Sequence, residues 1–328
     1  MPGPKHILII RFSSIGDIVL TTPVVRCIRN KYGADCVIHY ATKKAFAGWL
    51  KQNTYIDHVH VLEDGESVFS FVKKIKKDFR IHAIADLHHN LRSLIIKWHF
   101  PFVPKASFPK LNIRKWLYVR FKWDVMPNVH LVERYFKAVQ FLGVQYDGKG
   151  PDFFVSPEDE AAAAGWVHPA NEYAVVTVGA KFATKALPDD KMLELLRNIP
   201  GKIVLLGGKE DAEKARYLYE NCPGKDITDL CGKCSLGVSA AVVKNAARVY
   251  AHDTGLMHIA AAFNRPITLF WGNTTPKLGM GPFLAENAPL KPEFREVQGL
   301  SCRPCSKIGY AECPLGHFKC MREQDTSP

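Results

Sequence analysis

The sequence has no apolar run that approaches the roughly 18 residues of a membrane-spanning helix, which argues against an integral membrane protein. Its first segment, MPGPKHILIIRF, has too short an apolar stretch and too early a charge for a secretory signal. There is also no low-complexity tract and no internal repeat with a period of 20–50 residues. We therefore expect a soluble, cytoplasmic, folded protein.

Acidic residues are scarce in the first half of the chain. Residues 1–150 carry 24 Lys and Arg but only 11 Asp and Glu, so this half holds all the excess charge of a protein with net charge +12. Such asymmetry suggests that one domain meets an acidic partner, which could be nucleic acid, an anionic membrane surface or a phosphorylated substrate. A basic face kept only for solubility explains it equally well.

The excess charge is densest over residues 73–122, where 13 Lys and Arg face only Asp78 and Asp86. Aromatic residues alternate with them: Trp98, Phe100, Phe102, Phe108, Trp116, Tyr118, Phe121 and Trp123. This composition suits an anionic glycolipid at a membrane face, and it also suits single-stranded nucleic acid. Each aromatic could instead be part of the core.

Strand and helix patterns alternate along the chain, which predicts an α/β protein with parallel sheets. A turn-rich break near residues 147–170 separates an expected domain 1–160 from a second domain 170–328. In the first we expect strands 7–10, 36–40, 58–62 and 81–87 and helices 18–31, 43–52, 67–77 and 131–142, with 94–129 irregular but containing some helix. In the second we expect strands 173–178, 202–206, 248–252 and 266–271 and helices 188–198, 210–220, 236–246 and 256–263.

The first motif, SSIGD, lies where the strand at 7–10 leads into a helix. A carboxylate at a helix start can cap free N–H groups, and it can also be a base at the mouth of a ligand site. The residues alone leave both roles open for Asp17.

A second motif, HDTGLMHIAAA, delivers Asp253 to the end of a strand, and Thr254 and Gly255 open the next helix. Free N–H groups and a hydroxyl at a helix N-terminus suit a phosphate or diphosphate. His258 on the first turn could add a donor. A capping Asp on a packing helix is the alternative.

Two further strand ends carry residues suited to a nucleotide. The loop GAKFATKALP supplies Lys181 and Lys185, either of which could reach that diphosphate. The Gly207-Gly208 turn and Asp211 suit the close approach of a ring and the hydroxyls of a ribose. Three such strand ends in one domain are unlikely to coincide by accident.

Taken together, SSIGDIVLTTPVVRCIR, the Lys185-x-x-Pro188 loop, GGKED and DTGLMHIAAA resemble the bacterial lipopolysaccharide heptosyltransferases, glycosyltransferase family 9. The resemblance implies a GT-B fold, with two Rossmann-like domains facing each other across a cleft. It implies an N-terminal domain for an anionic lipid-linked saccharide acceptor and a C-terminal domain for an ADP-sugar donor. It also implies inverting, metal-independent transfer of heptose at the cytoplasmic face of the inner membrane, with no nucleic-acid partner.

The resemblance further assigns roles to individual residues. It makes Asp17 the general base and Lys185 the cation that neutralises the leaving diphosphate. It implies donor binding by Asp253, Thr254, Gly255 and His258, by Asp211 near the adenosine, and by an adenine-pocket wall at Cys234, Ser235 and Leu236. It implies acceptor binding by Ser13, Ser14 and Gly16, by His130 and Arg134 in HLVER, and by Arg92 next to the Asp86 and Ser93 motif.

The tail contains Cys302-x2-Cys305, followed by Cys313, His317 and Cys320. Tetrahedral zinc takes four such ligands, so Cys302, Cys305, Cys313 and Cys320 could hold a structural zinc ion. The default interpretation is that the tail cysteines are reduced packing thiols, or form disulfides on oxidation.

Two other functions remain compatible with the residues. A nucleotide-sugar epimerase or hydrolase of GT-B fold would share the phosphate turn but would turn over the donor alone. A nucleic-acid-binding protein would account for the basic aromatic half, but it would not account for the DTG motif or Lys185.

Overall fold

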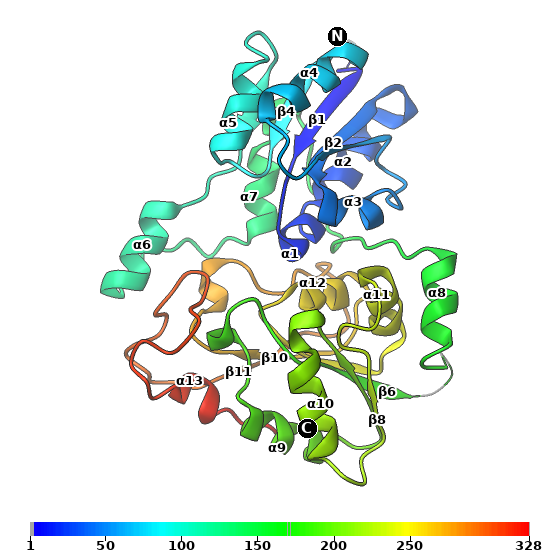
Figure 1. The fold of residues 1–328 in the computed structure, drawn as a ribbon. Coiled ribbons are helices and arrows are strands. Elements are labelled where there is room, and N and C mark those ends of the chain that lie inside the picture. The colour runs from blue at the N-terminus through cyan, green and yellow to red at the C-terminus, as the bar shows by residue number, and fades with distance from the viewer. Residues whose placement is uncertain (1–2, 169, 171, 328) are drawn as a thin grey trace. The chain divides into compact units, whose positions relative to one another are not determined.

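The computed structural model describes residues 3–168, 170 and 172–327, which form two compact units (Figure 1). The first unit comprises the described residues up to Lys110 together with Val129–Phe154. The second comprises Leu111–Asn128 together with the described residues from Val155 onward. Residues 169 and 171, at the expected domain boundary, lie outside the described part.

The first unit is built on a five-stranded parallel sheet in the order β3-β2-β1-β4-β5. Its strands are β1 (His6–Ile10), β2 (Val37–Lys43), β3 (His58–Leu62), β4 (Ala83–Asp86) and β5 (Lys105–Ser107). The last four residues of β1 are fully buried, which explains why this strand reads as an unbroken apolar run.

Helices connect these strands. They are α1 (Ile15–Val19), α2 (Thr22–Tyr32), α3 (Lys44–Leu50), α4 (Val68–Asp78), α5 (Leu91–Trp98) and α7 (Leu131–Lys137), with 3-10 turns at Gly33–Asp35 and Gln140–Leu142. Phe71 and Ile75 of α4 and Ile96 of α5 join Leu8 and Ile10 of β1 in one apolar core on one face of the sheet.

The second unit is built on a six-stranded parallel sheet in the order β11-β10-β9-β6-β7-β8. Its strands are β6 (Tyr173–Thr177), β7 (Lys202–Leu206), β8 (Ile227–Asp229), β9 (Arg248–His252), β10 (Ile267–Trp271) and β11 (Glu293–Glu296). In both sheets the strand order runs outward from the first strand and then reverses to its other side, as in a doubly wound nucleotide-binding fold.

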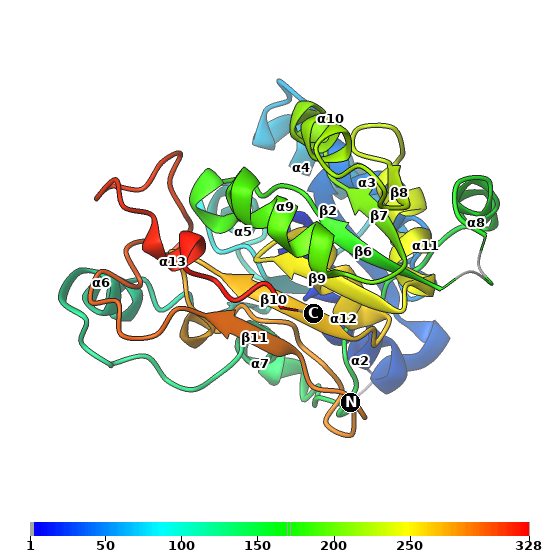
Figure 2. The same cartoon turned by 90° about the horizontal axis from the view of Figure 1, so that it is seen from below.

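The helices of the second unit are α6 (Asn112–Phe121), α8 (Pro157–Ala164), α9 (Asp189–Asn198), α10 (Ala212–Glu220), α11 (Leu236–Asn245), α12 (Gly255–Ala262) and α13 (Lys319–Arg322). Short 3-10 turns lie at Ala183–Lys185, Lys209–Asp211 and Pro276–Leu278. Helices α9, α10 and α13 share a core with one face of the sheet, and Figure 2 shows α9 and α10 stacked on that face. No helix within the described ranges is long and apolar enough to cross a bilayer.

The predicted α/β class is confirmed, with two corrections to the outline. The stretch 94–129, expected to be irregular with some helix, contains the end of α5 and helix α6, and it also contains strand β5, which was not expected. The units divide after Phe154, within the break expected near residues 147–170, but residues 111–128 group with the second unit rather than with the first.

Candidate active-site residues in the two units

The candidate residues follow the strands at which each sheet reverses its order. In the first unit these are β1 and β4, and in the second they are β6 and β9. Open parallel sheets bind ligands outside the carboxyl ends of the two strands at this point. Asp17 follows β1, Lys185 follows β6 and Asp253 follows β9 directly, so all three lie where this rule places a site.

Asp17 caps helix α1 and also forms an ion pair. Its Oδ2 accepts hydrogen bonds from the Ser14 backbone N–H at 3.2 Å and from the Ser14 hydroxyl at 2.9 Å. The same oxygen lies 2.6 Å from Nη2 of Arg11. The capping role and the role of a base, which the sequence left open, are therefore compatible, since the carboxylate that caps the helix is still partly exposed.

Arg11 fixes the geometry of this turn. Its side chain is buried, its Nε donates to the Ser13 carbonyl at 2.6 Å, and its Nη1 donates to the Leu87 carbonyl beyond β4 at 2.5 Å. Burial alone would lower the pKa of Arg11, but Asp17 and nearby tyrosines raise it on balance. A charged guanidinium thus ties the end of β1 to the end of β4 and to Asp17.

Further polar groups surround the Arg11–Asp17 pair. Arg11 lies over the ring of Tyr135, 5.7 Å from its centroid. Burial, reinforced by the charges of Arg11 and Lys110, lowers the pKa of His88 to about 4, so this imidazole is neutral. Burial also lowers the pKa of Arg134, on which Asp17 acts in the opposite direction. Arg134, a predicted acceptor residue, therefore lies within electrostatic reach of Asp17.

The other predicted acceptor residues have different environments. The His130 side chain caps α7 by accepting from Val132 N–H at 3.1 Å. Asp86 is fully buried and accepts from Lys97 at 2.9 Å and from Ser93 at 2.9 Å, so it organises the end of β4. Arg92 is exposed on the first turn of α5.

The second unit brings two predicted residues into direct contact. Nζ of Lys185 lies 2.6 Å from Oδ2 of Asp253, which also accepts from the Thr274 hydroxyl at 3.3 Å. Lys181, the alternative lysine, is exposed and stacks over Phe182. Between the two lysines, the structure therefore places Lys185 at the DTG turn.

The start of α12 offers the donors expected of an anion site. Thr254 is its N-cap residue in extended conformation, and Gly255 is its first residue. The Thr254 hydroxyl is buried and makes no hydrogen bond to any described residue. His258 is buried on the first turn. An unpaired hydroxyl beside the free N–H groups of a helix is suited to a phosphate oxygen.

Asp211 occupies space that two glycines leave open. A Cβ at Gly179 would lie 1.7 Å from Oδ1 of Asp211, and one at Gly207 would lie 2.7 Å from its Oδ2. Its Oδ2 accepts from the Gly208 N–H at 2.8 Å, and burial raises the pKa of the carboxyl group. Gly207, which the sequence suggested for the close approach of a ligand, thus makes room for this carboxylate, and so does Gly179.

The predicted adenine-pocket residues begin helix α11. The Ser235 hydroxyl accepts from Val238 N–H at 3.1 Å and donates to Asp159 at 3.0 Å. The Cys234 thiol lies 3.2 Å from the Ser239 hydroxyl, and Leu236 is half-buried. These contacts position the turn, and none of them involves the Lys185–Asp253 pair.

Sequence reasoning did not single out Arg11 or Thr274. Arg11 directly precedes the SSIGD turn, so its position next to the motif is a signal that could have identified it. Thr274 reaches Asp253 from beyond β10 and belongs to no local motif. Its contact arises only when the sheet brings β9 and β10 together.

The tail cysteines converge on one small cavity. Cys302, Cys305, Cys313 and Cys320 line a space of about 20 Å³ together with His317, whose Nε2 lies 4.0 Å from the Cys302 sulfur. Burial, opposed by Arg303 and reinforced by the other tail thiols, raises the pKa of Cys320 to about 12. All nine cysteines are free thiols. Within the described residues no three His, Cys, Asp or Glu side chains already have metal-binding geometry.

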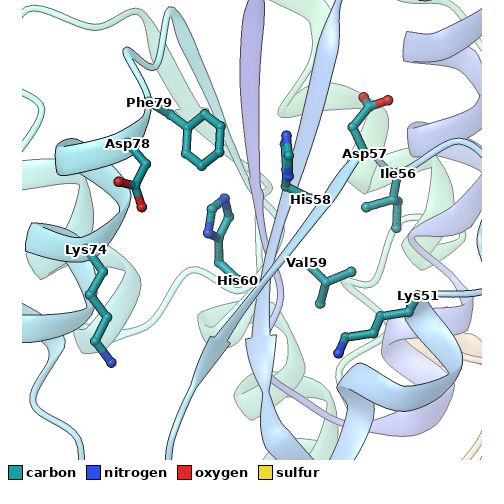
Figure 3. Close-up of a pocket in the computed structure, with 9 residues that line it drawn as sticks. All are labelled: Lys51, Ile56, Asp57, His58, Val59, His60, Lys74, Asp78 and Phe79. Atoms are coloured by element: carbon teal, nitrogen blue, oxygen red, sulfur yellow. The ribbon is translucent and has the colours of Figure 1, made fainter.

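A separate pocket of about 490 Å³ lies beside β3 and α4, between Lys51, His58, His60, Lys74 and Phe79 (Figure 3). The ring centroids of His58 and His60 lie 4.6 and 5.6 Å from that of Phe79. His58 begins β3, whereas Asp17 follows the carboxyl end of β1. The histidine pocket therefore lies towards the amino ends of the strands, whereas the candidate base follows their carboxyl ends.

Comparison with known proteins identifies the family of the chain. The model of glycosyltransferase family 9 (heptosyltransferase) matches residues 68–310. Lipopolysaccharide heptosyltransferase 1 of Campylobacter coli is 25% identical over 295 residues, which are 82% of this chain and 84% of that protein.

Solved structures show the same fold. A family 9 glycosyltransferase from Veillonella parvula has a TM-score of 0.74 at 19% identity and covers 92% of this chain and 90% of its own. The Escherichia coli heptosyltransferase WaaC with ADP has a TM-score of 0.65 at 22% identity, with 84% and 90% covered.

Two Rossmann-like units in one chain, matched by these solved structures, show the GT-B fold. The family match covers well over half of the chain, so the protein belongs to glycosyltransferase family 9, the heptosyltransferases. The predicted family, fold class and enzyme class are confirmed.

Proposed function

We propose that this enzyme transfers heptose from ADP-heptose to an anionic, lipid-linked acceptor of the lipopolysaccharide inner core. The transfer inverts the anomeric carbon, needs no metal for its chemistry and takes place at the cytoplasmic face of the inner membrane. ADP accompanies one solved relative, the WaaC structure, and the Campylobacter coli relative is named for lipopolysaccharide. Nucleic acid has no part in the reaction.

The main support for the proposed donor site is the Lys185–Asp253 pair, which lies next to the unpaired hydroxyl of Thr254 in the chain. Lys185 supplies a cation, and the N-terminus of α12 supplies N–H groups and a positive dipole end. Both stabilise the negative charge that develops on the diphosphate as its bond to the sugar breaks. The protein thereby provides the positive charge that a metal ion supplies in other transferases.

In the proposed reaction, Asp17 acts as the general base. A sugar hydroxyl is a poor nucleophile, so the proton that it loses must pass to a base as the new bond forms. The carboxylate of Asp17 takes that proton, the acceptor oxygen bonds to the anomeric carbon, and the bond to the ADP oxygen breaks with its electron pair. Arg11 and Ser14 hold the carboxylate in place during this step.

A calorimetric titration with ADP, GDP, UDP and ATP, without added metal, tests the donor site. We expect selective binding of ADP, and we expect Lys185→Ala to weaken it about tenfold or more, because a charge-assisted contact to phosphate is lost. Lys181→Ala is the matched control, since Lys181 lies in the same loop but is exposed and directed to Phe182. Absence of nucleotide binding, or equal effects of the two variants, would contradict the proposed donor site.

We also propose that the tail thiols hold a structural zinc ion. Four thiolates suit tetrahedral zinc, and the four cysteines already surround a cavity with room for a single small ion. The thiols must move inward to reach bonding distance, since the described residues hold no complete ligand set. Zinc binding would release thiol protons, including those of Cys305 and Cys320, whose pKa burial raises.

Elemental analysis of the purified protein tests this second proposal. We expect about one zinc ion per chain, lost together with thermal stability in Cys305→Ser. Cys222→Ser is the matched control, because this buried thiol of the same unit lies outside the tail cavity. Iron in place of zinc would contradict the choice of metal, and a metal-free protein would contradict the site.

A further inference from the structure

Helix α5 has two apolar faces, and only one of them is buried. Ile96 packs into the core of the first unit, whereas Leu91, Leu94 and Trp98 are exposed. These three residues are spaced three and four apart, so they form one stripe along the helix. Trp98 is 75% exposed, which is unusual for so large an apolar side chain.

The loop after α5 extends this stripe. Phe102 is 97% exposed at its tip. The Lys105 ammonium group donates to the carbonyls of Phe100 at 2.5 Å, Pro101 at 2.9 Å and Val103 at 3.0 Å. Three hydrogen bonds to one ammonium group brace the loop, so Phe102 is held outward rather than left to fold back.

Phe69 on the neighbouring helix α4 completes the apolar surface. It is 57% exposed, and its ring lies 5.1 Å from that of His99. A groove of about 750 Å³ lies between Phe69, Leu94, Trp98 and Pro101. We refer to Phe69, Leu91, Leu94, Trp98 and Phe102 as the α4–α5 patch.

Basic residues border this patch. Lys73 and Lys77 lie four and eight residues after Phe69 on α4, and both are exposed and form no ion pair with a described residue. Arg92 follows Leu91 and is exposed as well. Of the two acidic residues among positions 67–110, Asp86 is buried against Lys97 and only Asp78 is exposed, so the surface here keeps an excess of positive charge.

We propose that the α4–α5 patch docks on the surface of an anionic phospholipid bilayer. Aromatic and aliphatic side chains ringed by lysine and arginine match the boundary between acyl chains and anionic headgroups. The aliphatic members favour a bilayer over single-stranded nucleic acid, because bases stack on rings but not on Leu91 or Leu94. The inference rests on the proposed lipid-linked acceptor, which a docked enzyme would meet within the membrane plane.

Cosedimentation of the full chain with phospholipid vesicles tests the docking. We expect binding to phosphatidylcholine vesicles that contain phosphatidylglycerol, weak binding to vesicles without it, and a decline as salt is added. The double variant Trp98→Ala/Phe102→Ala should bind about tenfold more weakly or worse, because two large side chains no longer enter the acyl region. Lys73→Gln and Lys77→Gln should each cost about fivefold.

Trp166→Ala is the matched control, because Trp166 is also exposed but follows the acidic helix α8 in the second unit. It should bind vesicles as the wild type does. All variants should keep their circular dichroism and their affinity for ADP, so a loss of docking is distinguishable from failure of the donor site. The proposal would be overturned if the wild-type protein did not bind anionic vesicles, or if the double variant bound them as tightly as the wild type. Tighter binding to a single-stranded oligonucleotide than to vesicles would overturn it as well.

Discussion

At the scale of single residues, the carboxylate of Asp17 makes two structural contacts in the turn where we place the general base. Its Oδ2 is shared between Ser14 and Arg11, so the atom that caps α1 also holds a buried guanidinium. The proposed base would therefore be oriented before an acceptor binds, and orientation contributes much of what a catalytic group can do. Replacing it should therefore affect transfer much more than binding of the donor.

The variant Asp17→Asn tests this assignment. We expect transfer to fall about 10²–10⁴-fold, since the amide cannot take a proton from the acceptor. Affinity for ADP should stay the same, because the nucleotide is assigned to the second unit. Steady-state kinetics and calorimetry provide the two measurements, and Asp35→Asn is the control, an acidic residue on a 3-10 turn of the same unit. A variant that transfers heptose at the wild-type rate would rule out Asp17 as the base.

Two glycine variants should have opposite effects. In Gly179→Ala the new methyl group would collide with Asp211, so this carboxylate must leave the Gly208 N–H. We expect the free energy of unfolding to fall by about 1 kcal/mol and the affinity for ADP to weaken. In Gly48→Ala nothing lies within 4 Å of the new carbon, and this exposed helical site should gain about 0.5–1 kcal/mol. Denaturant titration measures the free energy of unfolding of both variants. A change of the same sign and size in the two would contradict this prediction.

At the scale of helices and strands, the elements missing from the sequence prediction are those without a clear apolar signal. Strand β8 has only three residues, and edge strand β11 reads EFRE, with a single apolar side chain. Helix α6 buries none of its residues, so no core-facing stripe marks its bounds within the stretch where some helix was expected. Conversely, the single helix expected at 18–31 is two helices, because a new one starts at Thr22 with Pro23 in its first turn.

Strands β1, β2 and β3 carry a ladder of histidines that links stability to pH. His39 is fully buried and hydrogen-bonds His6 at 2.9 Å and His60 at 2.8 Å. Burial, reinforced by neighbouring imidazoles, lowers the pKa of His39 to about 3 and that of His60 to about 4. The His39 and His60 rings are therefore neutral in the folded protein, whereas in the unfolded chain their pKa returns to about 6.5.

The contribution of these neutral rings to the free energy of unfolding should therefore be fully present above about pH 6.5. It should decline as the pH falls towards 4, because the unfolded chain binds more protons than the folded one in this interval. We expect His39→Gln to lose less stability than the wild type over this interval, by on the order of 2 kcal/mol. Chemical denaturation at a series of pH values measures the slope. The exposed His168 supplies the control His168→Gln, and parallel slopes for wild type and His39→Gln would contradict the ladder.

At the scale of the whole molecule, the two units should respond differently to the donor nucleotide. A ligand that binds one folded unit stabilises that unit by mass action, by about 2.7 kcal/mol at a hundredfold excess over Kd. We expect calorimetric unfolding to show two transitions, of which ADP raises only the one that belongs to the second unit. Lys185→Ala should reduce that shift, and equal movement of both transitions would contradict independent units.

The turns of the candidate site could be predicted from sequence because each is a short local signal between a strand and a helix. SSIGD, the Lys185 loop and the DTG turn were found for this reason. Their partners come from other strands: Leu87 beyond β4 accepts from Arg11, and Thr274 beyond β10 donates to Asp253. The choice of Lys185 over Lys181 likewise required the fold, because both lysines stand in the same loop.

The grouping of Leu111–Asn128 with the second unit has a consequence for how the gene can be divided. The chain passes from one unit to the other three times, so no single breakpoint yields two complete halves. A truncation after Phe154 would leave α6 attached to the wrong half and deprive the second unit of the Lys122 contact to Pro304 and the Asp124 pair with Lys277. Shuffling of intact halves between relatives must therefore exchange α6 together with the sequence that follows Val155.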